Sequence, residues 1–284
     1  MPLVLNRRAF LQGAVAAAAF AQSKNGARAA ARWAFLSDIH IPADREDRYR
    51  GFSPIANLGK AVPQVLQANL QGALITGDLA RVQGFKDDYQ AVKGLLDPVA
   101  ARVPLALTLG NHDDRTNFFA VYAPASQSPV RDRQVTVVEA PPLRFILLDS
   151  LLSTRLTPGF LGKDQRNWLE QYLKSSDATP TVIFVHHPPD DADNNLLDSD
   201  RLLRIVMPVR KVKAVVFGHS HVYRYDALEG LHLINLPAVG YNFNDSEPVG
   251  WVEARMAAEG ADLTLHAIGG NTARDGQMKS VEWR

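Results

Sequence analysis

Short apolar runs alternate with longer amphipathic stretches along the first three quarters of the chain. Five runs are rich in residues that suit buried strands: residues 33–36, 73–75, 105–109, 181–185 and 214–217. Helical periodicity marks four stretches: residues 54–70, 85–101, 163–175 and 198–207. The first strands and helices alternate, which predicts parallel strands joined by right-handed crossovers. The pattern is typical of an α/β protein.

Further strands joined by short turns are expected at residues 134–139, 144–148, 232–236, 250–257 and 262–267. They predict that parallel and antiparallel pairs occur together, in mixed sheets. The chain has 284 residues, of which 46% are hydrophobic, which is enough for one sizeable core. We find no internal repeat, coiled-coil heptad or membrane span in the sequence. Residues 30–284 are therefore expected to form a single domain.

Each of the five apolar runs is followed by side chains of the types that can bind metals. The segments are Ser37-Asp38-Ile39-His40, Gly77-Asp78, Gly110-Asn111-His112-Asp113, His186-His187-Pro188-Pro189 and Gly218-His219-Ser220-His221. Sites in open α/β sheets form beyond the carboxyl ends of strands, so separate strands can deliver side chains to one crevice. Ligand-type residues two apart are expected on one side of an extended segment. The glycines of these segments allow tight turns and close backbone approach.

Any one of these segments alone is weak evidence, because short motifs of this kind occur by chance. Their joint occurrence after five strands argues against coincidence. Six of the eight histidines fall inside the segments, and a structural role is expected for the other two, His232 and His266. Imidazole and carboxylate ligands suit Zn, Mn, Fe and similar ions, and the chain has no Cys to suggest another type of site.

The ordered set resembles the signature of the calcineurin-like metallophosphoesterases. This resemblance implies a four-layer α/β/β/α sandwich of two mixed β-sheets flanked by helices, the metallo-dependent phosphatase fold. It also implies two divalent or mixed-valence metal ions, drawn from Fe, Mn, Zn or Co, with Asp78 as the bridging ligand. The implied ligands are Asp38, His40 and His221 for the first ion, and Asn111, His186 and His219 for the second.

In this resemblance His112 holds no metal; it faces the scissile phosphate and stabilises or protonates the leaving oxygen. Asp113 or Asp114 is expected to orient its imidazole, as carboxylates beside functional histidines often do. Arg115 is a candidate phosphate contact, with a solvated loop arginine as the equal alternative. The polar segments 42–52 and 188–200 follow ligand-bearing strands and are expected to form walls that select the substrate.

The resemblance is closest to the class III cyclic-nucleotide phosphodiesterases and their glycerophosphodiesterase relatives. It rests on Gly110–Arg115, Leu147–Ser150, Gly159–Leu169 and His186–Pro189 and covers most of residues 33–236. It implies an enzyme that uses metal-activated hydroxide on a small or lipid-derived phosphodiester. The alternatives are an exported phosphomonoesterase that scavenges phosphate, or a non-catalytic interaction protein, which would be expected to have lost ligands. Residues 237–284 match no motif with a stated chemistry.

The amino terminus resembles a twin-arginine export signal. Arg7 and Arg8 precede an alanine-rich apolar stretch that is too short for a membrane span. Residues 1–29 are therefore a predicted signal peptide, cleaved after Ala21 or Ala29; the alternative is an alanine-rich helix packed on the domain. The expected location is the periplasm, reached through the twin-arginine export machinery.

Charge and composition exclude some other partners. The chain carries 31 Lys and Arg against 30 Asp and Glu, and cleavage removes only cations, so the mature protein is expected to be slightly acidic. It has no basic stripe with interleaved aromatic residues, so no nucleic acid is expected; the expected ligand is a small-molecule phosphoester. Without cysteine there is no disulfide framework to assemble after export.

Overall fold

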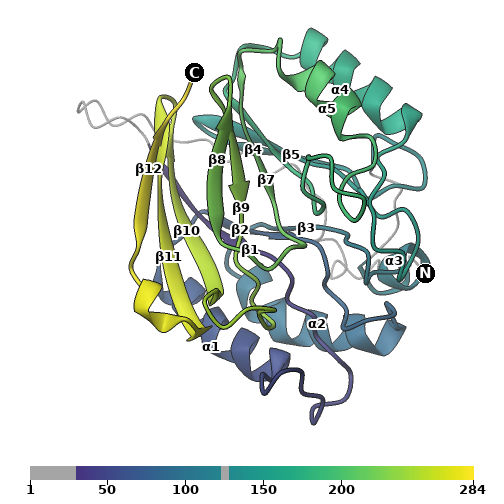
Figure 1. Ribbon diagram of the computed structural model, residues 1–284, viewed down its shortest axis with the longest axis vertical. Helices are drawn as coiled ribbons and strands as arrows, with labels where there is room; N and C mark the ends of the chain where they lie inside the picture. Colours follow the sequence, from purple (N-terminus) through teal and green to yellow (C-terminus); the bar gives the residue numbers. More distant parts are fainter. Residues whose placement is uncertain (1–29, 123–127) are drawn as a thin grey trace, which may run out of the picture.

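The computed structural model describes residues 30–122 and 128–284, so the predicted leader lies outside the described residues. Two six-stranded mixed sheets face each other between two layers of helices (Figure 1). The first sheet has the order β12 (Met278–Glu282), β11 (Gly260–Gly270), β10 (Pro248–Ala257), β1 (Ala31–Leu36), β2 (Gly72–Thr76), β3 (Leu105–Thr108). The second has the order β4 (Thr136–Ala140), β5 (Leu143–Leu147), β6 (Thr181–Phe184), β7 (Val212–Phe217), β9 (Leu231–Asn235), β8 (Arg224–Leu228).

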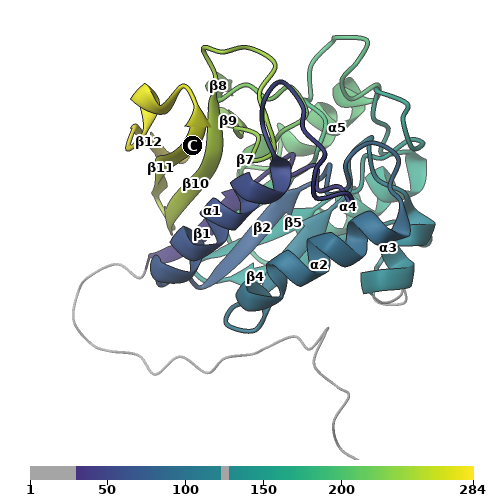
Figure 2. The same ribbon diagram turned by 90° about the horizontal axis from the view of Figure 1, so that it is seen from below.

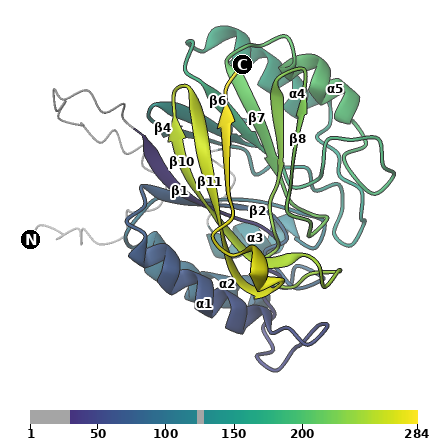
Figure 3. The same cartoon turned by 60° about the vertical axis from the view of Figure 1, so that its left-hand side comes forward.

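The helices form the two outer layers. Helices α1 (Pro54–Gln67), α2 (Lys86–Ala100) and α3 (Arg115–Tyr122) lie on the first-sheet side, as the view from below shows (Figure 2). Helices α4 (Lys163–Ser175) and α5 (Ser199–Val206) cover the outer face of the second sheet (Figure 3). The predicted four-layer α/β/β/α sandwich is confirmed. No helix among the described residues is long and apolar enough to cross a membrane.

The central strands are continuously apolar because both of their faces are buried. In β1, Ala34 and Leu36 pack under the helices, whereas Trp33 and Phe35 point between the two sheets. The ring of Phe35 meets that of Phe184 edge-on across the layer, with centroids 4.9 Å apart. The alternation along one strand therefore builds two cores, and a third lies under α4 and α5.

The parallel strands place their carboxyl ends at one end of the molecule. Strand β1 pairs parallel with β2, and β2 with β3, as the alternation of strands and helices predicted. In the second sheet β5, β6, β7 and β9 are also parallel. Backbone hydrogen bonds continue past the strand ends: Asp38 N donates to Gly77 O at 3.1 Å, and Gly218 N to His186 O at 3.0 Å. The first of these bonds joins the Asp38 segment to the Asp78 segment, and the second joins the His186 segment to the His219 segment.

Among the described residues, two strands, helix α3 and the short 3-10 helix Thr272–Arg274 were not predicted from the sequence. Strands β8 and β12 are outer strands whose side chains are mostly exposed, so their sequences carry little apolar alternation. Helix α3 has an apolar face formed mainly by Phe118, and its first residue is Arg115, so the alternative of a solvated loop arginine is wrong.

Candidate metal centre

The carboxylate of Asp78 lies at the middle of the predicted ligand set. Its Oδ2 is 3.6 Å from His40 Nε2 and 3.4 Å from His186 Nε2. A second carboxylate, Asp38, has its Oδ1 3.3 Å from His221 Nε2. Two atoms that each lie about 2.1 Å from one ion at a tetrahedral angle are about 3.4 Å apart. The spacing therefore fits cations held between these side chains.

The second half of the predicted set is also assembled, although less tightly. His219 Nδ1 lies 2.9 Å from Asn111 Oδ1, and the rings of His219 and His186 have centroids 5.2 Å apart. His219 Nε2 lies 3.0 Å from the backbone oxygen of Asn194. In this structure the His219 ring thus contacts Asn111 and a neighbouring loop.

The buried nitrogen of His186 supports the presence of a metal ion. His186 is completely buried, and its Nε2 has no hydrogen-bond partner in the part of the chain that the structure describes. An unsatisfied buried nitrogen costs free energy that coordination to a cation would remove. The imidazoles and carboxylates gathered here are ligands that transition metals accept. The residues present therefore fit a metal ion.

Backbone carbonyls orient the imidazoles of the centre. His40 Nδ1 contacts Arg81 O at 3.2 Å, His186 Nδ1 contacts Thr76 O at 2.7 Å, and His221 Nδ1 contacts Tyr241 O at 2.6 Å. A carbonyl only accepts, so each Nδ1 carries a proton and each Nε2 faces the carboxylates. In this orientation each imidazole, once neutral at Nε2, can bind a metal through that atom.

Most of the predicted ligands have an unusual backbone conformation. The φ angles of Asp38, His40, Asp78, His219 and His221 are 51°, 46°, 48°, 69° and 55°. Such left-handed conformations are uncommon for non-glycine residues and cluster at functional sites. The expectation that the paired residues belong to extended segments is wrong, although both members of each pair do reach the centre.

Glycines make room for this packing. Gly77 has a φ of 93°, and a Cβ added there would lie 2.7 Å from the backbone nitrogen of Gly110 and 2.7 Å from His186 Nδ1. A Cβ on Gly218 would overlap the side chains of Ser37 and Asp38. The expected close approach is therefore present, and Gly77 also requires the left-handed φ.

The pKa values of the two buried carboxylates and of the histidines around them are shifted in different directions. Burial alone would lower the pKa of His186, but the charges of Asp78 and Asp38 outweigh it and raise this pKa to about 9. Burial lowers the pKa of His40 to about 3 and that of His219 to about 4. Burial opposes ionisation of Asp38 and Asp78 too, yet the neighbouring histidines bring both of their pKa values below the usual range. In the metal-free centre one imidazolium, His186, lies between two carboxylates.

His112 is held beside the centre by backbone groups. Its backbone N–H donates to Asp78 Oδ1 at 2.9 Å, its Nδ1 contacts Val82 O at 3.1 Å, and its Nε2 lies 4.0 Å from Asp78 Oδ2. The side chain is 28% exposed, which leaves Nε2 open to a ligand. The carbonyl of Val82 therefore orients this imidazole.

The interpretation that Asp113 or Asp114 orients the His112 imidazole is wrong. Asp113 is buried and accepts hydrogen bonds from Leu79 N, Gly110 N and Tyr89 Oη, so it ties the turns together and does not orient His112. Asp114 Oδ1 accepts from Asn117 N at 2.9 Å, inside the start of α3.

Arg115 is also not a phosphate contact. Its guanidinium makes a bidentate pair with the buried Asp149, with distances of 2.7 and 2.8 Å. The fork geometry of arginine is thus used inside the fold.

Comparison with known proteins agrees with this arrangement. Residues 31–223 match the calcineurin-like phosphoesterase family. The chain belongs to this family. It is a metallophosphoesterase, an enzyme that hydrolyses phosphoric esters.

Several curated relatives carry phosphodiesterase names. A probable cyclic nucleotide phosphodiesterase of Vesicomyosocius okutanii is 28% identical over 76% of this chain and 89% of the relative. The glycerophosphodiester phosphodiesterase GpdQ of Enterobacter lignolyticus is 29% identical over 76% of this chain and 81% of the relative. A cAMP/cGMP dual specificity phosphodiesterase of Mycobacterium tuberculosis is 28% identical over 80% of this chain and 73% of the relative.

Solved structures share the fold at lower identity. A dimetal phosphatase from Danio rerio superposes with a TM-score of 0.69 at 16% identity, over 89% of this chain and 99% of that one. A purple acid phosphatase from yellow lupin gives 0.60 at 16% identity, over 90% of this chain and 54% of that one.

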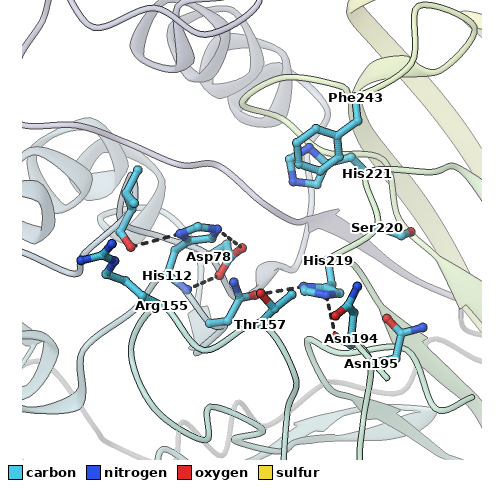
Figure 4. Close-up of a pocket in the computed structure, with 12 residues that line it drawn as sticks. Asp78, His112, Arg155, Thr157, Asn194, Asn195, His219, Ser220, His221 and Phe243 are labelled. Atoms are coloured by element: carbon cyan, nitrogen blue, oxygen red, sulfur yellow. Dashed lines mark hydrogen bonds and ion pairs between the residues drawn. The ribbon is translucent and has the colours of Figure 1, made fainter. Parts of the chain in front are cut away.

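A pocket of about 410 Å³ opens over the centre of the phosphoesterase (Figure 4). Asp78, Asn111, His112, His219 and His221 form its floor. Its walls come from Val82, Arg155, Thr157, Asn194, Asn195, Ser220 and Phe243.

The predicted walls are confirmed only in part. The polar segment 188–200 supplies Asn194 and Asn195, whereas the segment 42–52 supplies no lining residue, although its Tyr49 packs against Tyr241 and the lining residue Phe243. The two remaining histidines are structural: His232 Nε2 lies 2.7 Å from Glu282 O, and His266 stacks on Trp251.

The sequence motifs did not identify Arg155, Thr157, Tyr241 or Phe243. Phe243 is 51% exposed and stacks on His221 with ring centroids 4.3 Å apart, and Tyr241 stacks on His40 at 4.7 Å. These two aromatic residues come from the segment that had no assigned chemistry. Their only sequence signal is the run of aromatic and asparagine residues at 241–244.

Proposed function

We propose that the metallophosphoesterase is a phosphodiesterase that acts on a small or lipid-derived phosphodiester, with two divalent or mixed-valence metal ions. The observation that carries the proposal is the position of Asp78, whose carboxylate adjoins one histidine from each predicted ion set, His40 and His186. Relatives that match three quarters or more of this chain are named phosphodiesterases, and this supports a preference for diesters. Fe, Mn, Zn and Co are the candidate metals.

The residues of the centre have distinct proposed roles. Two bound ions would supply Lewis acidity, which makes water a better nucleophile and neutralises phosphate charge. Asp78 is the proposed bridge between them. The proposed ligands are Asp38, His40 and His221 for one ion, and Asn111, His186 and His219 for the other.

His112 is the proposed group that assists the leaving oxygen. In the hydrolysis a bond forms between a water oxygen and phosphorus, one ester P–O bond breaks, and the departing oxygen takes up a proton. Because Val82 O accepts from Nδ1–H, Nε2 is the atom that faces the pocket, and the imidazolium form of His112 can donate its Nε2 proton to the departing oxygen. His112 also lies beside Asp78. Unlike His186, it has no buried nitrogen without a hydrogen-bond partner, and this suits a residue that contacts substrate.

Hydrolysis of matched aryl esters tests the proposal. The protein, loaded in turn with Mn, Zn, Fe or Co, is assayed with bis(p-nitrophenyl) phosphate and with p-nitrophenyl phosphate. We expect a higher kcat/KM for the diester with at least one metal, and loss of both activities in excess chelator. Asp78→Ala, which removes the bridge, serves as the background control.

Two results would support other functions. A higher kcat/KM for the monoester with every metal would indicate a phosphomonoesterase, the second candidate. No metal-dependent hydrolysis of either ester would favour an interaction protein, which the complete ligand set argues against.

We also propose that residues 1–29 are a twin-arginine leader and that residues 30–284 act in the periplasm. The proposal is supported by Arg7 and Arg8 before an alanine-rich stretch. Replacing both arginines with lysine keeps the charge but removes the paired arginines that are read as the address. We expect the precursor of this variant to stay in the cytoplasm, measured by cell fractionation; normal export would refute the leader while leaving the catalytic proposal intact.

A further inference from the structure

One fixed positive charge lines the pocket. Among the lining residues, all of which are described, Arg155 is the only Lys or Arg, and Asp78 is the only Asp or Glu. The other wall side chains are neutral, namely Val82, Thr157, Asn194, Asn195, Ser220 and Phe243. A guanidinium in such a wall attracts anionic groups on whatever enters the pocket.

The guanidinium of Arg155 is not used by the fold. The side chain is exposed, and no hydrogen bond or ion pair joins it to another residue within 30–122 and 128–284. The neighbouring arginines differ, because Arg115 and Arg133 both bind the backbone oxygen of Leu151 and both approach Asp149. Arg155 is therefore available to a ligand, whereas its neighbours are structural.

The backbone of Arg155 is nevertheless firmly placed. Its N–H donates to the carbonyl of Asn111, a predicted metal ligand, at 2.7 Å, and its φ is 67°. On one side Thr154 Oγ1 donates to Asp113 O at 2.8 Å; on the other, Thr157 O lies 3.0 Å from Nε2 of the buried His187. A left-handed arginine persists only where surrounding contacts hold it, and here they tie it to the metal-binding turn.

The position of Arg155 relative to His112 indicates which part of the substrate it meets. Figure 4 shows the Arg155 guanidinium on the opposite side of the His112 imidazole from Asp78. The scissile phosphate belongs beside Asp78, and His112 is proposed to assist the leaving oxygen. A leaving alcohol that extends past His112, away from Asp78, would therefore reach this guanidinium.

We propose that Arg155 selects phosphodiesters whose leaving alcohol carries a second anionic oxygen group, a carboxylate or a phosphate. This inference rests on the proposed phosphodiesterase function. The planar fork of arginine matches the two oxygens of such a group. A charge-assisted hydrogen bond in a partly enclosed pocket corresponds to a preference of about tenfold or more.

Two aryl diesters test this selection, because the nitrophenolate is the known leaving group in both. They are the methyl phosphodiesters of 4-nitrophenol bearing a 3-carboxylate or a 3-carboxamide, which are similar in shape and differ in charge. For the metal-loaded wild-type enzyme we expect kcat/KM to be about tenfold higher for the carboxylate, after correction for leaving-group pKa, and the ratio to fall as salt increases.

Variants locate the preference. Arg155→Gln should abolish the ratio, and Arg155→Lys should retain part of it, because lysine keeps the charge but loses the fork. Arg131→Gln is the matched control, since this arginine is highly exposed, pairs with no described residue other than its neighbour Asp132 and does not line the pocket. Metal content and unfolding midpoint are measured for each variant.

The possible failures can be told apart. If the wild type hydrolyses both diesters with no preference, or Arg155→Gln and Arg155→Lys lower kcat/KM equally for both, the inference is overturned while the phosphodiesterase proposal stands. Equal losses of kcat/KM for both diesters would mean that Arg155 binds the scissile phosphate or supports the fold. If the wild type hydrolyses neither diester with any metal, both proposals fall.

Discussion

Replacing Gly77 with alanine should damage the metal centre without removing a ligand. The added Cβ would lie 2.7 Å from the backbone nitrogen of Gly110 and 2.7 Å from His186 Nδ1, both closer than ordinary van der Waals contact. Neither neighbour can easily yield, because Gly110 N donates to Asp113 at 2.9 Å and His186 Nδ1 contacts Thr76 O at 2.7 Å. His186 would have to shift by about 0.5 Å or more, whereas metal sites tolerate about 0.2 Å.

Two costs add up in this variant. Alanine at a φ of 93° costs about 1–2 kcal/mol, and overpacking of a buried site typically costs about 1–3 kcal/mol. We therefore expect the free energy of unfolding of the metal-free protein to fall by about 2–5 kcal/mol, measured by urea denaturation. Affinity for at least one ion should fall by about tenfold or more, measured by competition with a chelating dye.

Other glycines separate these costs. Gly51 has a φ of 82° and open space where a Cβ would lie, so Gly51→Ala should show the backbone cost alone, about 1–2 kcal/mol. Gly94 is exposed within α2 and also has open space, so Gly94→Ala should stabilise the protein by about 0.5–1 kcal/mol. If Gly77→Ala matches Gly51→Ala in stability and binds both ions like the wild type, close packing at this turn does not support the centre.

Three further changes probe the centre itself. Asp78→Ala should reduce metal content at both sites, measured by elemental analysis; normal content with full activity in chelator would refute the bridge. His112→Ala should keep its metals but lose about 10²- to 10⁴-fold in kcat toward esters with poor leaving groups, with the deficit shrinking as leaving-group pKa falls; an equal deficit across the series would make His112 an electrostatic group. Because the pKa of His186 is raised to about 9 in the metal-free centre, this imidazole is protonated below that pH and must lose its proton to bind a metal. Metal affinity should therefore rise with pH up to about 9, and titration calorimetry in several buffers near pH 7.5 should detect release of about one proton per chain; no release would contradict the assignment.

The sequence predicted the buried strands, most of the helices and the ligand-bearing turns because these depend on strong local signals, whereas the four-layer arrangement was implied by the family resemblance. The apolar runs of β1 and β2 are buried on both faces, and α4 was predicted with the bounds Lys163–Ser175 that the structure has. Strands β8 and β12 were missed because an exposed outer strand needs no apolar face. The apolar pattern that identifies buried strands and helices is therefore absent from their sequences.

The pocket walls were harder to predict than its floor. The floor residues occur in short ordered motifs, whereas Arg155 and Phe243 belong to loops that reach the site through tertiary contacts such as Arg155 N to Asn111 O. Arg115 was misjudged for a related reason, because its partner Asp149 lies 34 residues further along the chain. Spacing within a motif carries no information about such distant partners.

The predicted ligands come from both sheets, so metal binding would also contribute to the stability of the contact between the sheets. Asp38 and Asp78 follow strands of the first sheet, whereas His186 and His221 follow strands of the second. Ions shared among them would act as cross-links at the open end of the sandwich, in addition to the apolar layer between the sheets. A ligand at a hundred times its dissociation constant stabilises the native state by about 2.7 kcal/mol. Removing the metal with a chelator would therefore also lower the stability of the protein, because it would weaken the contact between the two sheets.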